Sequence, residues 1–367
     1  MYFTGIELSN FRNYTREKVN FHRKVNIFLG KNAQGKTNLL EALYMTSFGK
    51  SFRRVRDADM IRIGSKYAGI KADFVKNELE MKVEIGLVRG GKSIRLDGVN
   101  LKKTSQLLNN VHIVMFSPED LRIIKDEPAK RRNFIDREIC QISSVYYSEL
   151  SGYQRVLQQR NAVLRSENPD SGILDVWDRE LTRYGAAVIT RRESFIAGMS
   201  EISSKIHRDL TNGKEQLSAV YAPNAKVNGT LKEKQEQFMD ILEENRQTDL
   251  ERRTTCRGPH RDDLNMYIGD MEIRKFGSQG QQRTAALSLK LAEIDLIRRE
   301  TGDEPVLLLD DVLSELDQTR QRQLMSSFGD IQIFITSTEM DRETGRKIPD
   351  HTVFHVENGT VHSDDNL

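Results

Sequence analysis

Eight consecutive residues near the start of the chain have the types and spacing that would hold a polyphosphate. Two glycines allow the backbone to wrap closely around phosphate oxygens, with consecutive N–H groups pointing inward. A lysine can then reach the terminal phosphates, a threonine hydroxyl can be a ligand of Mg²⁺, and the start of the following helix adds a favourable dipole. The residues are Gly30, Lys31, Asn32, Ala33, Gln34, Gly35, Lys36 and Thr37, directly after an apolar run. They predict a phosphate-binding loop for a nucleoside triphosphate with Mg²⁺.

Two acidic residues end another apolar run in the last fifth of the chain. Asp310 and Asp311 directly follow residues 306–309, which are Val-Leu-Leu-Leu. In a nucleotide-binding fold such a strand places its terminal acid beside the metal, so we expect Asp310 next to the Mg²⁺ that Thr37 binds. Asp311 would lie beside the γ-phosphate, where a carboxylate can orient or deprotonate the attacking water. We therefore expect Lys36, Asp310 and Asp311 to be catalytic; the alternative is that the two acids only terminate a strand.

A polar segment at residues 278–283 leads into an amphipathic helix. Ser278 can cap this helix and Gly280 lies close by, so the helix start is a natural site for an anion. Water or a neighbouring carboxylate could fill the same place. The nucleotide-binding candidates in this segment are Ser278, Gly280 and Gln281.

The densest basic cluster lies at residues 50–56. Arg53, Arg54 and Arg56 could neutralise DNA phosphates without reading the base sequence, and the interleaved Phe52 could stack on a base. A solvated surface loop is the competing interpretation, because acidic residues follow closely. Residues 130–132, Lys-Arg-Arg, are a lesser candidate for DNA contact. Nothing resembles a base-reading module, so we expect no sequence-specific binding.

A turn at residues 258–261, Gly-Pro-His-Arg, contains a histidine that invites a catalytic interpretation. We expect His260 to be a hydrogen-bonding structural group rather than a general base. Arg257 and Arg261 beside it could reach a phosphate or a facing subunit.

The elements that must position these residues follow from the periodicity of the apolar residues. Alternation predicts strands at residues 6–11, 25–29, 67–75, 79–88, 92–96, 111–116, 306–309 and 331–335, and a hairpin at 352–356 and 360–362. Helical spacing predicts helices at residues 36–48 and about 280–299, and a helix start at 117–120. Between these two mixed regions the apolar residues recur at helical intervals without sustained heptads, which indicates a short helical lobe.

We therefore expect an α/β fold with three parts. Residues 1–118 would form the N-terminal part of an ATPase head, 119–253 a helical arm lobe, and 254–367 the C-terminal part of the head. The phosphate loop and the acid-tipped strand lie in different parts, so the nucleotide site would be assembled from both ends of the chain.

Composition narrows the class of protein further. The 56 basic and 54 acidic residues give a net charge of only +2, so any DNA binding must come from clustered charge. Cys140 and Cys256 have no metal-ligand spacing, and we interpret them as incidental thiols of a reducing compartment. No apolar run approaches the roughly 18 residues of a membrane span, and no secretory signal is visible. We expect a cytoplasmic protein.

In order along the chain, these motifs resemble the ATP-binding-cassette architecture and, more narrowly, the RecF family of SMC-like DNA-repair ATPases. The resemblance covers essentially the whole chain. It depends on residues 10–14 (Asn-Phe-Arg-Asn-Tyr), the phosphate loop with Asn38, residues 116–121 (Phe-Ser-Pro-Glu-Asp-Leu), 258–264 (Gly-Pro-His-Arg-Asp-Asp-Leu), 278–283 and 308–317. It implies a P-loop ATPase head with an antiparallel β subdomain and an inserted helical arm lobe.

The resemblance also implies roles for several residues. Arg12 would lie beside the nucleotide, residues 314–317 (Ser-Glu-Leu-Asp) would form the D-loop, and Ser278 of one subunit would cap the γ-phosphate held by another. Two positions depart from the pattern: a switch histidine is replaced by residues 336–338 (Thr-Ser-Thr), and Asp311 stands where Glu is more common. The usual Q-loop glutamine is also missing after residue 116. Because a shorter carboxylate reaches less far toward the water, we expect slow hydrolysis.

The function implied is an ATP-dependent homodimer that binds DNA at single-strand gaps. With the partner proteins RecO and RecR it would help to load recombinase, in DNA repair, replication restart and SOS induction. A weak, DNA-stimulated ATPase activity is expected. Two alternatives are a transporter ATPase subunit, which the large helical insertion argues against, and a scaffold with structural ATP, which measurable hydrolysis would exclude. A GTPase is not expected, because no Asn-Lys-x-Asp segment occurs.

Overall fold

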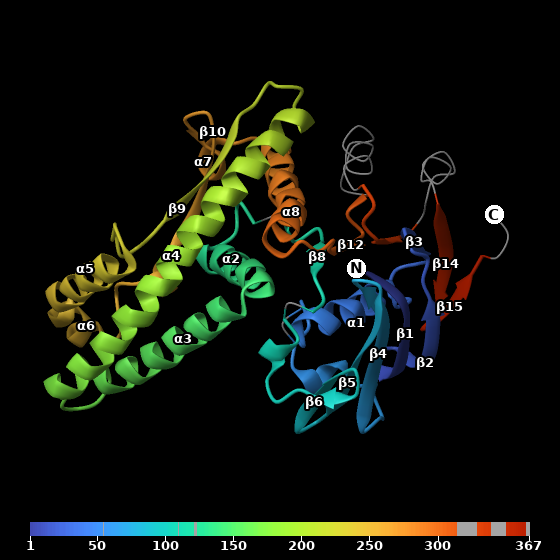
Figure 1. Ribbon diagram of the computed structural model, residues 1–367, viewed down its shortest axis with the longest axis horizontal. Helices are drawn as coiled ribbons and strands as arrows, with labels where there is room; N and C mark the ends of the chain where they lie inside the picture. The colour runs from blue at the N-terminus through green and yellow to red at the C-terminus, as the bar shows by residue number, and fades with distance from the viewer. Residues whose placement is uncertain (54, 109, 121–122, 314–328, 339–349, 365–367) are drawn as a thin grey trace. The chain divides into compact units, whose positions relative to one another are not determined.

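The computed structural model describes residues 1–53, 55–108, 110–120, 123–313, 329–338 and 350–364 of the 367-residue chain (Figure 1). Contacts divide the chain into two compact units. The head unit comprises residues 1–120 and 297–367, and the arm unit comprises residues 121–296. Each unit contains its own β-structure, and each is described separately below.

A six-stranded, mostly parallel sheet carries the phosphate loop in the head unit. Its strand order is β15-β14-β3-β13-β12-β8, and β15 pairs antiparallel at the edge. The central strands are buried, which fits their continuous apolar sequences. The strands are β3 (Val25–Leu29), β8 (Ile113–Phe116), β12 (Val306–Asp310), β13 (Ile333–Ser337), β14 (His351–Glu357) and β15 (Thr360–Ser363). Because β3, β13 and β12 are parallel neighbours, their carboxyl ends meet at one edge of the sheet.

The second head sheet is antiparallel, with the order β2-β1-β4-β5-β6-β7. Its strands are β1 (Tyr2–Phe11), β2 (Tyr14–Asn20), β4 (Tyr67–Lys76), β5 (Leu79–Val88), β6 (Gly91–Leu96) and β7 (Val99–Asn100). Buried and exposed residues alternate along β4, as expected where one face of a sheet covers a core. Turns at residues 89–90 and 97–98 join β5 to β6 and β6 to β7.

Helix α1 (Lys36–Phe48) contacts strands of both head sheets. Eleven of its thirteen residues are buried, so the helix has no solvent-exposed face, as expected of a helix enclosed on all sides. It ends at Gly49, whose φ of +62° is the left-handed conformation that closes many helices. The phosphate loop is thus fixed between a central strand and a fully enclosed helix.

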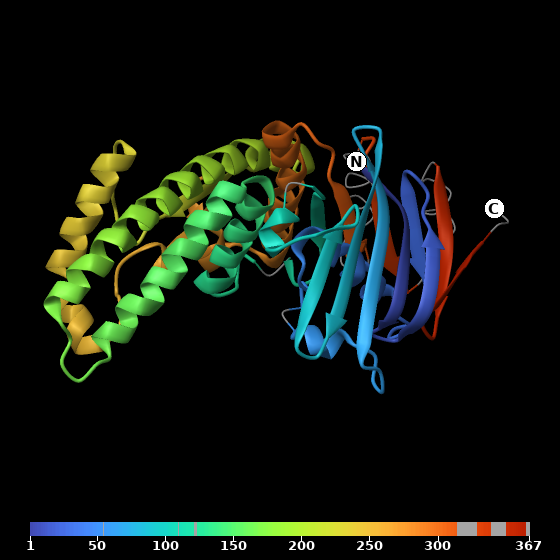
Figure 2. The ribbon, with the colours of Figure 1, turned by 60° about the horizontal axis from the view of Figure 1, so that its bottom comes forward.

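The arm unit combines long helices with a small antiparallel sheet. The helices are α2 (Pro128–Ile142), α3 (Ser144–Leu164), α4 (Ser171–Leu210), α5 (Leu231–Glu244), α6 (Arg246–Arg252), α7 (Ile273–Phe276) and the larger part of α8 (Gln279–Thr301). The sheet has the order β11-β10-β9, with β9 (Leu217–Ala222), β10 (Asp263–Ile268) and β11 (Met271–Glu272). Helices α3 and α4 pack side by side (Figure 2). Among the described residues, no helix combines the length and the apolar composition that crossing a membrane requires.

The structure confirms the predicted α/β fold with its antiparallel β subdomain and helical arm lobe. One prediction about elements was wrong: strand β9 lies in the region predicted to be a helical lobe. At the helix start predicted at 117–120, the Asp120 carboxylate accepts from the Ser117 N–H and hydroxyl at 2.8 Å. Residues 121–122 lie outside the described residues, and α2 begins at Pro128.

The two compact units divide the chain differently from the expected boundaries at 118/119 and 253/254. The first division, at 120/121, lies two residues away, but the second lies at 296/297. Residues 254–296 contact the arm because β10 pairs with β9 along six residues, from Asp263 opposite Ala222 to Ile268 opposite Leu217. Buried arginines on α2 and α4 also bind acids at the start of β10, as described below.

Candidate nucleotide site

The phosphate loop connects β3 to α1 and contains two glycines where no side chain would fit. A Cβ atom on Gly30 would lie 2.3 Å from the carbonyl oxygen of Val356. Gly35 has a φ of +124°, and a Cβ atom there would lie 2.8 Å from Nδ2 of Asn13. The Tyr14 hydroxyl donates a hydrogen bond to the Gly35 carbonyl at 3.0 Å. The turn between β1 and β2 therefore braces the loop, and glycine is required at both positions.

Two side chains at the start of α1 bind the phosphate loop and the acid-tipped strand. The Lys36 ammonium group donates to the carbonyls of Gly30 and Lys31. Burial lowers the pKa of Lys36, and Asp311 and Asp310 oppose this shift. The Thr37 hydroxyl donates to Oδ1 of Asp310 at 2.8 Å, although the two residues are 273 positions apart. The two ends of the chain thus meet at one site.

Thr336 on β13 links the two acidic residues. Its hydroxyl donates to Oδ1 of Asp310 at 2.8 Å and accepts from the backbone N–H of Asp311 at 3.1 Å. Burial raises the pKa of Asp310, and the bonds from Thr336 and Thr37 oppose that shift. Asp311 has a φ of +55°, a conformation uncommon outside glycine. The sequence did not predict that Thr336, one of the residues in place of the switch histidine, would orient Asp310.

A cavity of about 160 Å³ opens beside these groups. Its wall consists of Asn32, Ala33, Gln34, Gly35, Lys36, Thr37, Asn38, Arg53, Asp311 and Thr336. Most of the predicted loop residues therefore line the cavity. Gly30 and Lys31 do not line it, and their carbonyls accept hydrogen bonds from Lys36. The wall combines a backbone loop, two cationic side chains, a carboxylate and two hydroxyls, which is the donor set that a triphosphate needs.

Two arginines that the sequence singled out, Arg12 and Arg53, lie near the cavity, and of these two Arg53 is part of its wall. Arg12, expected beside the nucleotide, is not among the residues that line the cavity; its guanidinium group instead binds the fully buried Glu41 at 2.8 and 2.7 Å. Arg53, expected to contact DNA, is part of the wall and donates to Oδ1 of Asn38 at 3.0 Å. It also lies 3.8 Å from the Glu41 carboxylate. Arg54 lies outside the described residues, and Arg56 is exposed.

The segment at 278–283, called the signature segment below, belongs to the arm unit. Ser278 and Gln281 cap the start of α8 reciprocally: the Ser278 N–H donates to Oε1 of Gln281 at 2.9 Å, and the Gln281 N–H donates to Oγ of Ser278 at 3.2 Å. Gln282 is buried and donates to the carbonyls of Ile273 and Gly277. Gly280 lies in the first turn. The predicted D-loop at 314–317 lies outside the described residues.

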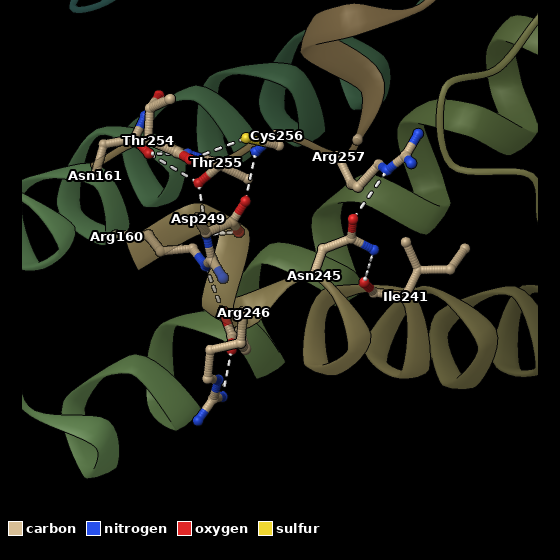
Figure 3. Close-up of polar contacts among 12 residues, drawn as sticks. Arg160, Asn161, Ile241, Asn245, Arg246, Asp249, Thr254, Thr255, Cys256 and Arg257 are labelled. Atoms are coloured by element: carbon tan, nitrogen blue, oxygen red, sulfur yellow. Dashed lines mark hydrogen bonds and ion pairs between the residues drawn. The ribbon is translucent and has the colours of Figure 1, made fainter. Parts of the chain in front are cut away.

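The Gly-Pro-His-Arg turn is structural, as predicted for His260. Nε2 of His260 lies 3.0 Å from the Thr255 carbonyl, so Nδ1 accepts from the Tyr153 hydroxyl at 2.7 Å. Burial lowers the pKa of His260 to about 4, which keeps the ring neutral. Arg257 and Arg261 are exposed on either side. Figure 3 shows that Arg257 points toward Asn245, whose Oδ1 accepts from it at 3.3 Å.

Three buried arginines in the arm were not foreseen. Arg160 binds Asp249 and Thr255 at 2.7 and 2.8 Å (Figure 3). It also binds Asp178. Arg192 binds Asp136 and Asp262, and Arg131 binds both carboxylate oxygens of Asp263 at 2.6 and 2.8 Å. Arg131, part of a suggested DNA-contacting run, is only 1% exposed and is therefore excluded from that role.

The fold and the site together define a class of protein. A parallel sheet with a phosphate loop after β3, an acid-tipped β12 and an antiparallel second sheet form an ATP-binding-cassette head of the SMC type, into which an arm is inserted. The sequence model of the RecF/RecN/SMC N terminal domain matches residues 2–360.

Relatives narrow the assignment. The chain is 44% identical over 368 residues to the DNA replication and repair protein RecF of Clostridioides difficile (strain 630), covering 100% of this chain and 99% of the relative. It is 41% identical to RecF of Alkaliphilus oremlandii (strain OhILAs), covering 97% and 98%. A solved structure of the recombination mediator protein RecF-ATPrS in the RecFOR pathway has a TM-score of 0.93 at 34% identity, covering 99% and 98%. An Smc head bound to the C-winged helix domain of ScpA has a TM-score of 0.57 at 16% identity, which supports the fold alone. The chain belongs to the RecF family of DNA replication and repair proteins.

Proposed function

We propose that the chain binds ATP with Mg²⁺ in the head-unit cavity. The observation that carries this proposal is the 2.8 Å bond between Thr37 and Asp310, which brings the phosphate loop and the acid-tipped strand together. The loop N–H groups and Lys36 would hold the β- and γ-phosphates. Arg53 supplies a second cation from the wall of the same cavity. Arg12 would act by holding Glu41, against which Arg53 also lies.

The donor set at this site fits Mg²⁺. Neighbouring oxygen ligands of an octahedral Mg²⁺ at about 2.0–2.1 Å lie about 2.9 Å apart. Oγ1 of Thr37 and Oδ1 of Asp310 are 2.8 Å apart and are both hard oxygen donors. Among the described residues there is no cluster of three His, Cys, Asp or Glu side chains, so phosphate oxygens and water would complete the shell. Bound there, the ion would neutralise phosphate charge.

Hydrolysis of ATP would depend on Asp311. Asp311 lies in the cavity wall, and its carboxylate would orient the attacking water or accept its proton. Lys36 would stabilise the phosphate charge, and Asp310 would help to hold the Mg²⁺. Thr336 fixes the backbone of Asp311 through the 3.1 Å bond. The short side chain of Asp311 limits its reach, so we propose weak, DNA-stimulated hydrolysis.

We propose that the chain is an ATP-dependent homodimer that binds DNA at single-strand gaps and, with RecO and RecR, helps to load recombinase in the cytoplasm. The names of its relatives, a DNA replication and repair protein and a recombination mediator in the RecFOR pathway, support this proposal. Ser278, Gly280 and Gln281 of one copy would cap the γ-phosphate held by the other. DNA contact is assigned to the exposed Arg56 and its neighbour Arg54, while Arg53 serves the nucleotide. Repair, replication restart and SOS induction would depend on this loading.

Mass measurement by light scattering after size exclusion tests the proposal. The wild-type chain should be a dimer with ATP and Mg²⁺, a monomer with ADP, and should bind a gapped duplex only as the dimer. A chain that stays monomeric at saturating ATP and Mg²⁺ would refute the proposed mechanism. DNA binding that is equal with ATP and ADP would refute the nucleotide control of DNA residence.

A further inference from the structure

A chain of hydrogen bonds connects the signature segment to the end of α4 within the arm unit. Nε2 of Gln281 donates to Oε1 of Glu215 at 2.9 Å. The other oxygen of this carboxylate, Oε2, lies 3.1 Å from Nε2 of His207, the fourth residue from the end of α4. Nδ1 of His207 lies 3.0 Å from Oγ of Ser288. The chain therefore leaves α8 at Gln281 and returns to it about two turns later.

The burial of His207 determines the protonation pattern of this chain. The ring is 0% exposed, and burial lowers its pKa, so it is neutral near pH 7. A neutral ring that donates from Nε2 to the Glu215 carboxylate must accept at Nδ1. The Ser288 hydroxyl has a single proton and donates it to that position, in place of its alternative bond to the Thr284 carbonyl at 2.8 Å. Each polar group in the chain then has a partner.

Glu215 also decides which way the Gln281 amide faces. Because Nε2 of Gln281 donates to Glu215, its Oε1 faces the backbone N–H of Ser278. Oγ of Ser278 accepts from the Gln281 N–H. The hydroxyl proton of Ser278 has no acceptor among the residues that the structure describes, so it can be donated to a phosphate oxygen.

We propose that Glu215 and His207 are positioning residues for the signature segment. This inference rests on the proposed function: they preset the Ser278 hydroxyl and the first-turn N–H groups of α8 to receive the γ-phosphate of a second copy. A donor group that is already held in place loses less conformational freedom on binding than a mobile one. Glu215 and His207 would therefore strengthen the dimer interface without contacting the second copy themselves. The end of the long arm helix α4 is thereby linked to ATP-driven dimerisation.

Two substitutions at residue 215 separate positioning from packing. Glu215→Ala removes both acceptors and should weaken the ATP-dependent dimer about tenfold, the effect of losing one charge-assisted hydrogen bond. Affinity of the monomer for ATP should not change. Glu215→Gln should restore the dimer, because its carbonyl oxygen can still accept from Gln281. Its amide would donate to Nε2 of His207, which then becomes the acceptor while Nδ1 donates to Ser288.

The experiment measures dimer dissociation by analytical ultracentrifugation in ATP and Mg²⁺, and amide hydrogen exchange of residues 277–284 without nucleotide. Glu215→Ala should show faster exchange at residues 278 and 281 than wild type, and Glu215→Gln should not. Glu233→Ala is the matched control, because it removes another arm carboxylate that caps α5. Wild-type exchange and wild-type dimerisation in Glu215→Ala would overturn the inference. Hydrogen exchange is measured without a dimer, so it tests whether Glu215 anchors the signature segment even if the wild-type chain stays monomeric in ATP. A wild-type chain that stays monomeric in ATP would overturn the proposed function instead.

Discussion

Substitution of Thr336 by valine tests the proposed arrangement of the two acidic residues. Valine has nearly the same shape, so the change removes the hydroxyl and leaves the packing of this 1%-exposed side chain. The lost bond to ionised Asp310 contributes about 1.5–3 kcal/mol. The Asp311 N–H loses one acceptor but keeps the Thr336 carbonyl at 3.3 Å, so little is added there. We expect the free energy of unfolding to fall by about 2–3 kcal/mol and the melting temperature by about 4–10 °C.

The pH dependence of the stability difference tests whether the lost bond is the one to Asp310. Burial already raises the pKa of Asp310, and loss of the Thr336 bond should raise it further. A raised folded-state pKa means that ionised Asp310 costs stability at neutral pH, and that this cost disappears as the pH falls below its pKa. The difference between wild type and Thr336→Val should therefore shrink in acid.

Calorimetry of wild type, Thr336→Val and Thr336→Ser, with and without ATP and Mg²⁺, is the assay. Serine keeps the hydroxyl and should recover most of the loss, and ATP should raise the melting temperature of Thr336→Val less than that of wild type. Equal melting temperatures for Thr336→Val and wild type would refute the reasoning, as would a serine variant no better than valine.

Other residues of the site and of the arm give further expectations. Lys36→Met should abolish ATP binding measured by calorimetric titration, and with it nucleotide-driven DNA binding; a retained affinity would contradict the phosphate-loop assignment. Asp311→Asn should lower single-turnover hydrolysis by about 10²-fold or more while ATP still drives dimerisation, trapping the closed form on DNA; hydrolysis at the wild-type rate would exclude the role of Asp311. Arg160→Met should destabilise the arm by about 3–5 kcal/mol in urea unfolding, because it leaves buried carboxylates unpaired; a change below about 1 kcal/mol would show that these charges are solvated. His260 should destabilise the wild-type chain by about 2 kcal/mol at pH 5, because the unfolded ring binds a proton that the folded ring, with a pKa of about 4, does not. His260→Gln should lack this loss between pH 7 and pH 5, and an unchanged pH profile would contradict the buried neutral ring.

Local physical chemistry explains which parts of the fold were predictable from the sequence. Strand 25–29 and helix 36–48 match the structure residue for residue, since the loop glycines and the change of period mark their limits. The proximity of Thr37 and Asp310 was expected because an acid-tipped strand in a nucleotide-binding fold ends beside the metal. Strand β9 was not predicted from the sequence, because its partner strand β10 begins about 40 residues later. The place of Arg53 in the cavity wall was not predicted, because charge density along the chain does not reveal which side chain faces a cavity.

The buried arginines explain why the segment that leads into α8 belongs to the arm. Arg160, Arg192 and Arg131 come from three helices, yet each binds an acid between residues 249 and 263. Buried ion pairs add little net stability, but their directional bonds permit only one arrangement of the groups they join. Apolar packing alone would tolerate small shifts of this returning segment. The segment leads through β10, β11 and α7 into Ser278 and α8. Its fixed geometry therefore supports the hydrogen bond that Gln281 donates to Glu215. A substitution that loosens these ion pairs should therefore impair ATP-driven dimerisation before it unfolds the arm.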